Sequence, residues 1–143
     1  MYRIKSALGC LAMLGALATY GAEADDQPPS PRPAAPEASD IARTEDVIYG
    51  RKYGLALTMD VFAPRQKSNG RGIIFCVSGG WFSSKESISQ DFLSEFLSRG
   101  YTVFAVVHGS QPKFTIPEVL EDMHRAVRFI RANAAKYGVD PDK

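Results

Sequence analysis

Apolar and polar residues alternate through the middle of the chain in the manner of β-strands. Every second residue from Leu55 to Val61 is large and apolar, and a period of two is typical of a strand with one buried face. The stretch from Thr44 to Gly50 also has strand character, and Lys52-Tyr53-Gly54 separates it from the next strand, Leu55 to Phe62. A short turn containing glycine between two strands predicts an antiparallel hairpin.

Two later segments, Gly72–Val77 and Thr102–Val107, are short and continuously apolar. Such runs are typical of strands that are covered on both faces within a parallel sheet. A helix is expected after the first run, because Ser87 and Gln90 have the spacing of a capping box. An apolar stripe follows these residues, and Arg99-Gly100 is a typical helix end.

The clearest helical pattern lies near the carboxyl end of the chain. Thr115 and Glu118 form a second potential capping box, and Gly138 and Pro141 end the segment. The apolar residues between them keep the spacing of one continuous helical face. They are Ile116, Val119, Leu120, Met123, Val127, Ile130, Ala134 and Tyr137.

The predicted elements follow the order β, β, β, α, β, α. A hairpin followed by alternating units predicts an α/β fold with a mixed, mostly parallel sheet. A long amphipathic helix after a parallel strand normally leads into the next parallel strand. Because the sequence has only a short tail after this helix, we expect the first part of a larger domain, truncated before that strand.

The first 43 residues differ in composition from the rest. Residues 1–24 show the order of a secretory signal peptide, with two basic residues, an uncharged apolar run and a small-x-small cleavage site. Residues 25–43 are expected to be a disordered Pro/Ala-rich linker, because residues 25–40 hold five prolines and no aliphatic side chain larger than alanine. We therefore expect a secreted or periplasmic protein whose folded part spans residues 44–143.

Charge and cysteine content narrow the classes of function. The chain has 17 basic and 16 acidic residues, a net charge of +1, so no overall field attracts nucleic acid or, after signal cleavage, an anionic membrane. Cys10 lies within the expected signal peptide, where a lipoprotein site at Leu8-Gly9-Cys10 is a minor alternative because the preceding apolar stretch is very short. Cys76 is then alone in the mature chain, which excludes an intramolecular disulfide.

Several segments match one family in order and spacing. Leu57–Pro64 is similar to an L-x-x-D-V-Y-x-P strand, and Ile73–Trp81 lies where that family has a strand followed by His-Gly-Gly-Gly-Trp. Gly100–Val106 is similar to a G-Y-x-V strand, Ile116–Ile130 to a P-x-x-x-x-D-x-x-x-A-x-x-x-I helix, and Tyr137–Pro141 to the turn before the nucleophile strand. The chain thus resembles the N-terminal part of an α/β-hydrolase of the secreted esterase/lipase branch, which is feruloyl-esterase-like or BD-FAE-like.

The resemblance implies acyl transfer by a Ser-His-acid triad, with backbone N–H groups that bind the oxyanion. Gly79, Gly80 and Trp81 match the end of the family's oxyanion loop, although Val77-Ser78 stands where the family has His and its first Gly. The same glycines would also suit a plain tight turn. The sequence contains no G-x-S-x-G elbow, so the nucleophile, acid and base are expected beyond Lys143.

The other candidate residues have simpler interpretations. His108 follows a predicted strand, but the family's catalytic His comes far later, and His124 lies on the polar side of the last helix. Asp122 matches a family Asp that serves a structural hydrogen bond, and Cys76 is expected to be an inert core thiol. The pair Trp81-Phe82 either lines an acyl or aromatic pocket or covers the sheet. No residues have metal-ligand spacing, and no cofactor is expected.

Three hypotheses about function remain open at this point. The chain is a fragment of a secreted serine hydrolase, inactive alone, whose intact relatives cleave small-molecule or carbohydrate esters. Alternatively, it is a non-enzymatic secreted α/β binding module, or it is completed by a second polypeptide. In the family's sheet, the strand Ile73–Val77 lies beside the missing nucleophile strand. The isolated chain is therefore expected to be poorly soluble or unstable, because that edge would be apolar and unpaired.

Overall fold

The computed structural model describes residues 40–143 of the chain. The expected signal peptide and most of the expected linker lie outside the described residues. The described part contains four strands, two α-helices and two short 3-10 turns at Lys85–Ser87 and Ala134–Tyr137. In chain order, the main elements are β1 (Ile41–Lys52), β2 (Leu55–Pro64), β3 (Gly72–Val77), α1 (Gln90–Leu97), β4 (Thr102–Val107) and α2 (Ile116–Ala132).

The four strands form one sheet in the order β1-β2-β4-β3. β1 and β2 form the expected antiparallel hairpin, β2 pairs antiparallel with β4, and β3 pairs parallel with β4. The prediction of an α/β fold with a mixed sheet is confirmed. The prediction of a mostly parallel sheet is wrong for residues 40–143, because a two-residue turn forces β1 and β2 to run in opposite directions and β2 then lies antiparallel to β4.

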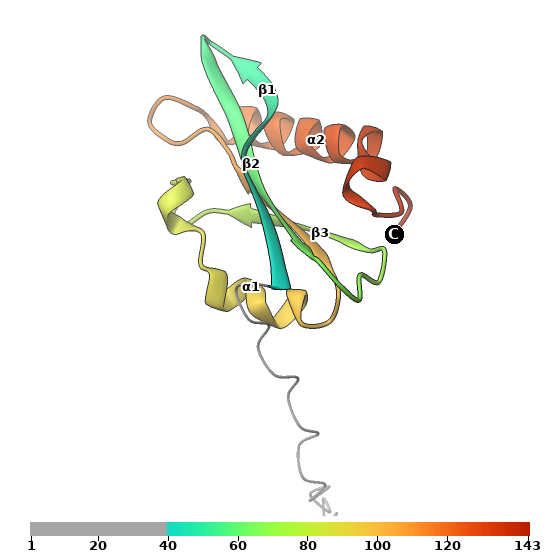
Figure 1. Ribbon diagram of the computed structural model, residues 1–143. Helices are drawn as coiled ribbons and strands as arrows, with labels where there is room; N and C mark the ends of the chain where they lie inside the picture. The colour runs from blue at the N-terminus through green and yellow to red at the C-terminus, as the bar shows by residue number, and fades with distance from the viewer. Residues whose placement is uncertain (1–39) are drawn as a thin grey trace, which may run out of the picture. The chain divides into compact units, whose positions relative to one another are not determined.

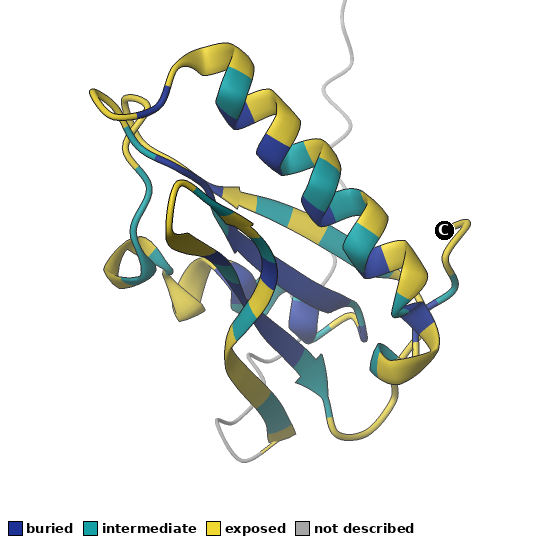
Figure 2. Ribbon diagram, turned by 90° about the horizontal axis from the view of Figure 1, so that it is seen from above, coloured by how far each residue is buried: buried dark blue, intermediate teal, exposed yellow. Residues whose placement is uncertain are grey.

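The helices cover opposite faces of the sheet, so the described part has three layers (Figure 1). Leu93 and Leu97 of α1 are buried against one face, together with Val103 and Ala105 of β4. On the other face, the buried residues of α2 point toward the sheet (Figure 2). The core on that side contains Tyr49, Leu57, Met59, Val61, Phe104, Val106, Ala126, Ile130, Ala134 and Val139.

β1 begins at Ile41, three residues before the boundary expected from the pattern. An irregularity in its pairing with β2 lies between Thr44 and Val47, where Asp46 has a φ of 54°. The buried carboxylate of Asp60 stabilises this bulge, since it accepts hydrogen bonds from the Arg43 guanidinium (2.6 Å) and from the Asp46 backbone N–H (3.0 Å). The bulge re-aims the strand and positions acidic side chains used further on.

The two helices differ in how well their ends were predicted. The capping box at Ser87 is wrong: Lys85–Ser87 is a 3-10 turn, and Ser89 caps α1 by accepting a hydrogen bond from the Phe92 backbone N–H (3.3 Å). The Thr115–Glu118 pair of α2 is confirmed, because the Glu118 carboxylate accepts a hydrogen bond from the Thr115 backbone N–H (2.8 Å). Both helices therefore start with a serine or threonine cap.

β3 lies at one edge of the sheet and has a single strand neighbour, β4. Ile74 and Cys76 are exposed on the face that α2 covers elsewhere, so the prediction of full burial of this strand is wrong for the described residues. Cys76 is accordingly not a core thiol. A hollow of about 270 Å³ borders Ile74, Val127 and the tail at Asp140. Among residues 40–143, no helix has both the length and the apolar character needed to cross a bilayer.

Candidate active site: the Gly-Gly-Trp loop

Residues 78–84, the Gly-Gly-Trp loop, leave the carboxyl end of β3 in a tight reversal of the chain. Gly79 and Phe82 exchange two backbone hydrogen bonds, with N···O distances of 2.9 and 3.0 Å. The two residues between them have positive φ angles, 58° for Gly80 and 68° for Trp81. Two successive left-handed residues closed in this way form a type I′ turn. The structure therefore brings the three predicted residues together in one turn.

The backbone N–H groups inside this turn are available to a ligand. Within residues 40–143, neither the Gly80 nor the Trp81 N–H donates a hydrogen bond, and both residues are exposed. A left-handed tryptophan is energetically unfavourable, and such outliers cluster at functional sites. Pairs of preorganised N–H groups are the donors that stabilise an oxyanion during acyl transfer. The geometry is compatible with that role, which stays a prediction.

The far end of the loop is fixed to β1 by charge. The Lys85 ammonium lies 2.8 Å from a carboxylate oxygen of Glu45 and 2.8 Å from one of Asp46. These hydrogen bonds raise the pKa of Lys85 above its ordinary value, with Asp46 as the first cause. Since Asp46 sits on the bulge that Asp60 stabilises, the bulge in β1 provides an anchor for the segment that follows the loop.

A hollow of about 280 Å³ lies beside the loop. Phe75 and Val77 of β3 contribute its floor, and the exposed ring of Phe82 borders it. The rest of the lining consists of one glycine and five serines, namely Gly79, Ser78, Ser83, Ser84, Ser87 and Ser110. Of the two interpretations of Trp81-Phe82, the position of Phe82 favours the lining of a pocket, because this residue borders the hollow and is 61% exposed.

The two histidines of the described part do not form a triad. His108 is buried at the carboxyl end of β4, and its Nδ1 lies 2.6 Å from the Gly109 carbonyl oxygen. His124 is exposed on α2, as predicted. In residues 40–143, no hydrogen bond joins either imidazole to a serine hydroxyl or a carboxylate, and no group of three or more His, Cys, Asp or Glu side chains is placed to hold a metal ion.

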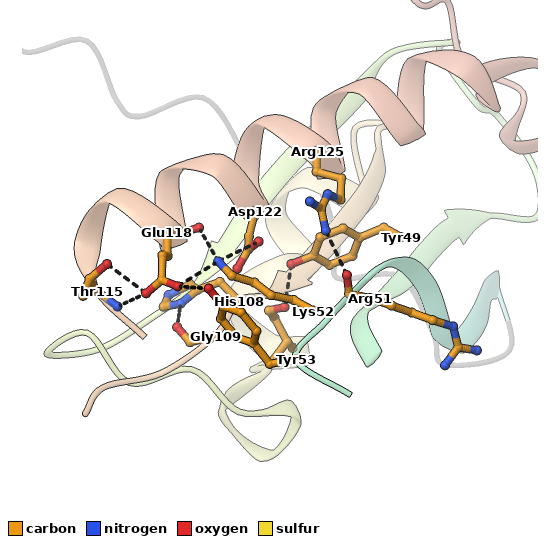
Figure 3. Close-up of polar contacts among 11 residues, drawn as sticks. Tyr49, Arg51, Lys52, Tyr53, His108, Gly109, Thr115, Glu118, Asp122 and Arg125 are labelled. Atoms are coloured by element: carbon orange, nitrogen blue, oxygen red, sulfur yellow. Dashed lines mark hydrogen bonds and ion pairs between the residues drawn. The ribbon is translucent and has the colours of Figure 1, made fainter. Parts of the chain in front are cut away.

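A second polar cluster joins the β1–β2 hairpin to the start of α2 (Figure 3). The Lys52 ammonium lies 3.5 Å from Oδ1 of Asp122 and 3.6 Å from Oε1 of Glu118. Asp122 is fully buried, and its Oδ2 has no hydrogen-bond partner within residues 40–143. The ion pair with Lys52 agrees with the structural role predicted for Asp122, since a buried carboxylate needs a cation nearby.

The carboxylate of Glu118 is the strongest acceptor of this cluster. It accepts hydrogen bonds from the Thr115 backbone N–H, the Thr115 hydroxyl (2.9 Å) and the Tyr53 hydroxyl (2.9 Å). These bonds, first the one from the Thr115 backbone, lower the pKa of Glu118 from 4.5 to about 2.

Burial, with the nearby Asp122 charge as a smaller cause, raises the pKa of Tyr49 well above its ordinary value. Its hydroxyl donates to the Val107 carbonyl (2.9 Å).

Sequence reasoning missed the residues that hold the loop: Lys85, Ser83 and Ser110. One signal for the two serines was present, because each follows a strand of the predicted parallel pair. Side chains at the carboxyl ends of neighbouring parallel strands meet at one edge of the sheet. No sequence signal places Lys85 beside Glu45 and Asp46, since that contact depends on the bulge in β1.

Comparisons with known proteins define the family of this chain. The BD-FAE family model matches residues 59–143. The chain is 28% identical over 107 residues to the probable carboxylic ester hydrolase LipM of Mycobacterium tuberculosis, a match that covers 72% of this chain and 25% of LipM. It is 28% identical over 116 residues to the esterase LipQ of the same organism, covering 78% of this chain and 27% of LipQ.

Solved structures agree with this assignment. A truncated form of a carbohydrate esterase from gut microbiota aligns with a TM-score of 0.61 and 26% identity, covering 75% of this chain and 39% of that chain. The fold of residues 40–143 thus falls within the α/β-hydrolases, and the relatives that it matches are carboxylic ester hydrolases. The chain belongs to the BD-FAE family. It spans about a quarter of the length of the two curated relatives.

Proposed function

We propose that this chain is the N-terminal part of a secreted serine hydrolase and supplies its oxyanion-binding loop. Gly79, Gly80 and Trp81 lie in this loop, and the N–H groups of Gly80 and Trp81 stabilise the negative charge that develops on the carbonyl oxygen of an ester. The observation that carries the proposal is the turn itself: two exposed residues at the carboxyl end of β3 whose N–H groups have no partner in residues 40–143.

The edge of β3 supports the same proposal. β3 has no neighbour on one side within the described residues, and the turn lies directly after it. A strand added in parallel to β3 would end beside the turn, where a nucleophile at its carboxyl end meets the two N–H groups. The nucleophile, acid and base of this enzyme are therefore carried by sequence that follows Lys143, and the chain alone does not hydrolyse esters.

The substrate of the complete enzyme is a carboxylic ester of a small molecule or a carbohydrate. The relatives, which include a probable carboxylic ester hydrolase and a carbohydrate esterase, support this class. The N-terminal signal pattern supports a location outside the cytoplasm, either in a periplasm or in the medium. It needs no cofactor, because acyl transfer through a serine ester is complete with a triad and an oxyanion site.

The gene downstream of the codon for Lys143 tests this proposal. We expect the reading frame to encode a G-x-S-x-G elbow within about 15 residues, a typical length for a connection and the strand that follows it. A product extended through the elbow, acid and base should hydrolyse p-nitrophenyl acetate. A frame that closes without an elbow, together with a soluble and cooperatively folding chain, would overturn the proposal and favour the binding module.

A further inference from the structure

Two serines connect the Gly-Gly-Trp loop to the segment that follows β4: Ser83 lies within the loop, and Ser110 lies on that segment. β3 and β4 pair in parallel as far as Val77 and Val107. Beyond these residues the two segments of the chain separate: one continues into the loop and the other into the segment 108–114. Regular backbone pairing between them ends there, and the hydroxyl groups of Ser83 and Ser110 form the next hydrogen bonds between the two segments.

The hydroxyl of Ser110 satisfies both backbone groups of Ser83. It accepts a hydrogen bond from the Ser83 N–H at 2.8 Å and donates one to the Ser83 carbonyl at 3.0 Å. The Ser83 hydroxyl in turn accepts a hydrogen bond from the His108 N–H at 3.1 Å. Each serine therefore provides, through its side chain, the bonds that a further rung of the sheet would have made.

The hydrogen bonds between Ser110 and Ser83 lie only a few residues along the chain from the N–H groups of Gly80 and Trp81. Ser83 directly follows Phe82, whose backbone closes the turn on Gly79. The Gln111 N–H, next to Ser110, donates to the Trp81 carbonyl at 3.4 Å. The segment 110–111 thus contacts the loop on both sides of Phe82, and it fixes the position of Trp81 from outside the turn.

We propose that Ser110 is a positioning residue for the oxyanion-binding N–H groups of Gly80 and Trp81, acting through the backbone of Ser83. The function of the N–H groups rests on the proposed ester hydrolysis. The hydrogen-bonded link between Ser110 and Ser83 does not depend on that function. Both the donor and the acceptor capacity of the hydroxyl are used, so alanine at this position loses two hydrogen bonds, whereas threonine keeps both. A donor held within a fraction of an ångström is what makes such a site effective.

The chain contains a single tryptophan, Trp81, so its fluorescence reports directly on the loop. We would measure time-resolved anisotropy and acrylamide quenching for Ser110→Ala, Ser110→Thr and Ser98→Ala at low chain concentration. Ser98→Ala is the matched control, because the Ser98 hydroxyl also donates to a backbone carbonyl, that of Glu95 at 3.0 Å, on the distant helix α1. Urea unfolding of each variant shows whether an effect is local.

We expect Ser110→Ala to enlarge the fast component of the Trp81 anisotropy decay by about two-fold, since the freed turn moves on the nanosecond timescale. Ser110→Thr and Ser98→Ala should match the parent chain. An unchanged Trp81 decay in Ser110→Ala, or an equal change in Ser98→Ala, would overturn the positioning role. If the decay responds as expected but the extended enzyme shows no ester hydrolysis, the link stands and the proposed function fails.

Discussion

Gly80 and Trp81 adopt consecutive left-handed conformations in the Gly-Gly-Trp loop. Glycine takes this conformation at no steric cost, but a residue with a side chain loses about 1–2 kcal/mol. The chain accepts that cost at Trp81. In the same turn, the two adjacent N–H groups have no hydrogen-bond partner within residues 40–143, and this links an unfavourable backbone to the proposed binding of an oxyanion.

The adjacent glycines offer a matched pair for testing the turn. A Cβ at either Gly79 or Gly80 would meet no atom within 4 Å, but only Gly80 has a positive φ. We expect Gly80→Ala to lower the free energy of unfolding by about 1–2 kcal/mol and Gly79→Ala to change it by less than about 0.5 kcal/mol. Urea unfolding measures both, and equal effects would show that the turn does not require a left-handed residue at position 80.

At the scale of single residues, the sequence predicted the glycines and not their supports. The Gly-Gly-Trp match identifies Gly79, Gly80 and Trp81 because a tight turn leaves a local signature. Ser83 and Ser110 act through a contact between two separate connections, and serine is common in any loop. Cys76 was predicted to be buried because its strand is apolar, but burial depends on what lies beside the strand.

The start of α2 shows how one carboxylate stabilises an element. Glu118 accepts hydrogen bonds from Thr115 and Tyr53, and so connects the helix cap to the β1–β2 turn. Local spacing alone predicted the Thr115–Glu118 pair. The start of α1 was missed, because Ser87 and Ser89 are both suitable caps and local spacing does not choose between them. The helix that Ser89 caps buries Leu93 and Leu97 in the core.

The lowered pKa of Glu118 predicts a pH dependence of stability. Because its folded-state pKa is about 2, against 4.5 ordinarily, its contribution is complete above about pH 4.5 and is lost as the pH falls toward 2. Replacing Glu118 with Gln should flatten the stability profile in this window. Urea midpoints from pH 6 to pH 2 measure it, with Glu121→Gln as control, since Glu121 is exposed on the same helix. Parallel profiles for parent and Glu118→Gln would contradict the assignment.

At the scale of the whole molecule, the open edge of β3 is the main feature. α2 packs against β1, and its buried residues share a core with residues of β1, β2 and β4. Its side chains Leu120 and Ile116 are nevertheless exposed, although they share the predicted apolar face. The pattern shows that such residues need a cover but not which segment provides it. The order of elements was therefore predictable, while the proportion of parallel pairs and the burial of β3 were not.

An unpaired apolar strand edge promotes association between chains. We expect the purified chain to self-associate with rising concentration, and Ile74→Lys to reduce this, because a lysine on an edge strand opposes pairing with another edge. Ala135→Lys adds the same charge at an exposed position away from the sheet and should have little effect. Light scattering across a concentration series measures the self-association of the parent chain and both variants. A parent chain that stays monomeric would contradict the expectation.

We propose that this chain carries the oxyanion-binding loop of a BD-FAE hydrolase and has no triad within residues 40–143. The most direct measurement is p-nitrophenyl acetate hydrolysis by the purified chain, combined with fluorophosphonate labelling of its serines. We predict hydrolysis no faster than in buffer and no covalent label. Saturable hydrolysis, with stoichiometric labelling of one serine within residues 40–143 and loss of activity on labelling, would contradict the claim.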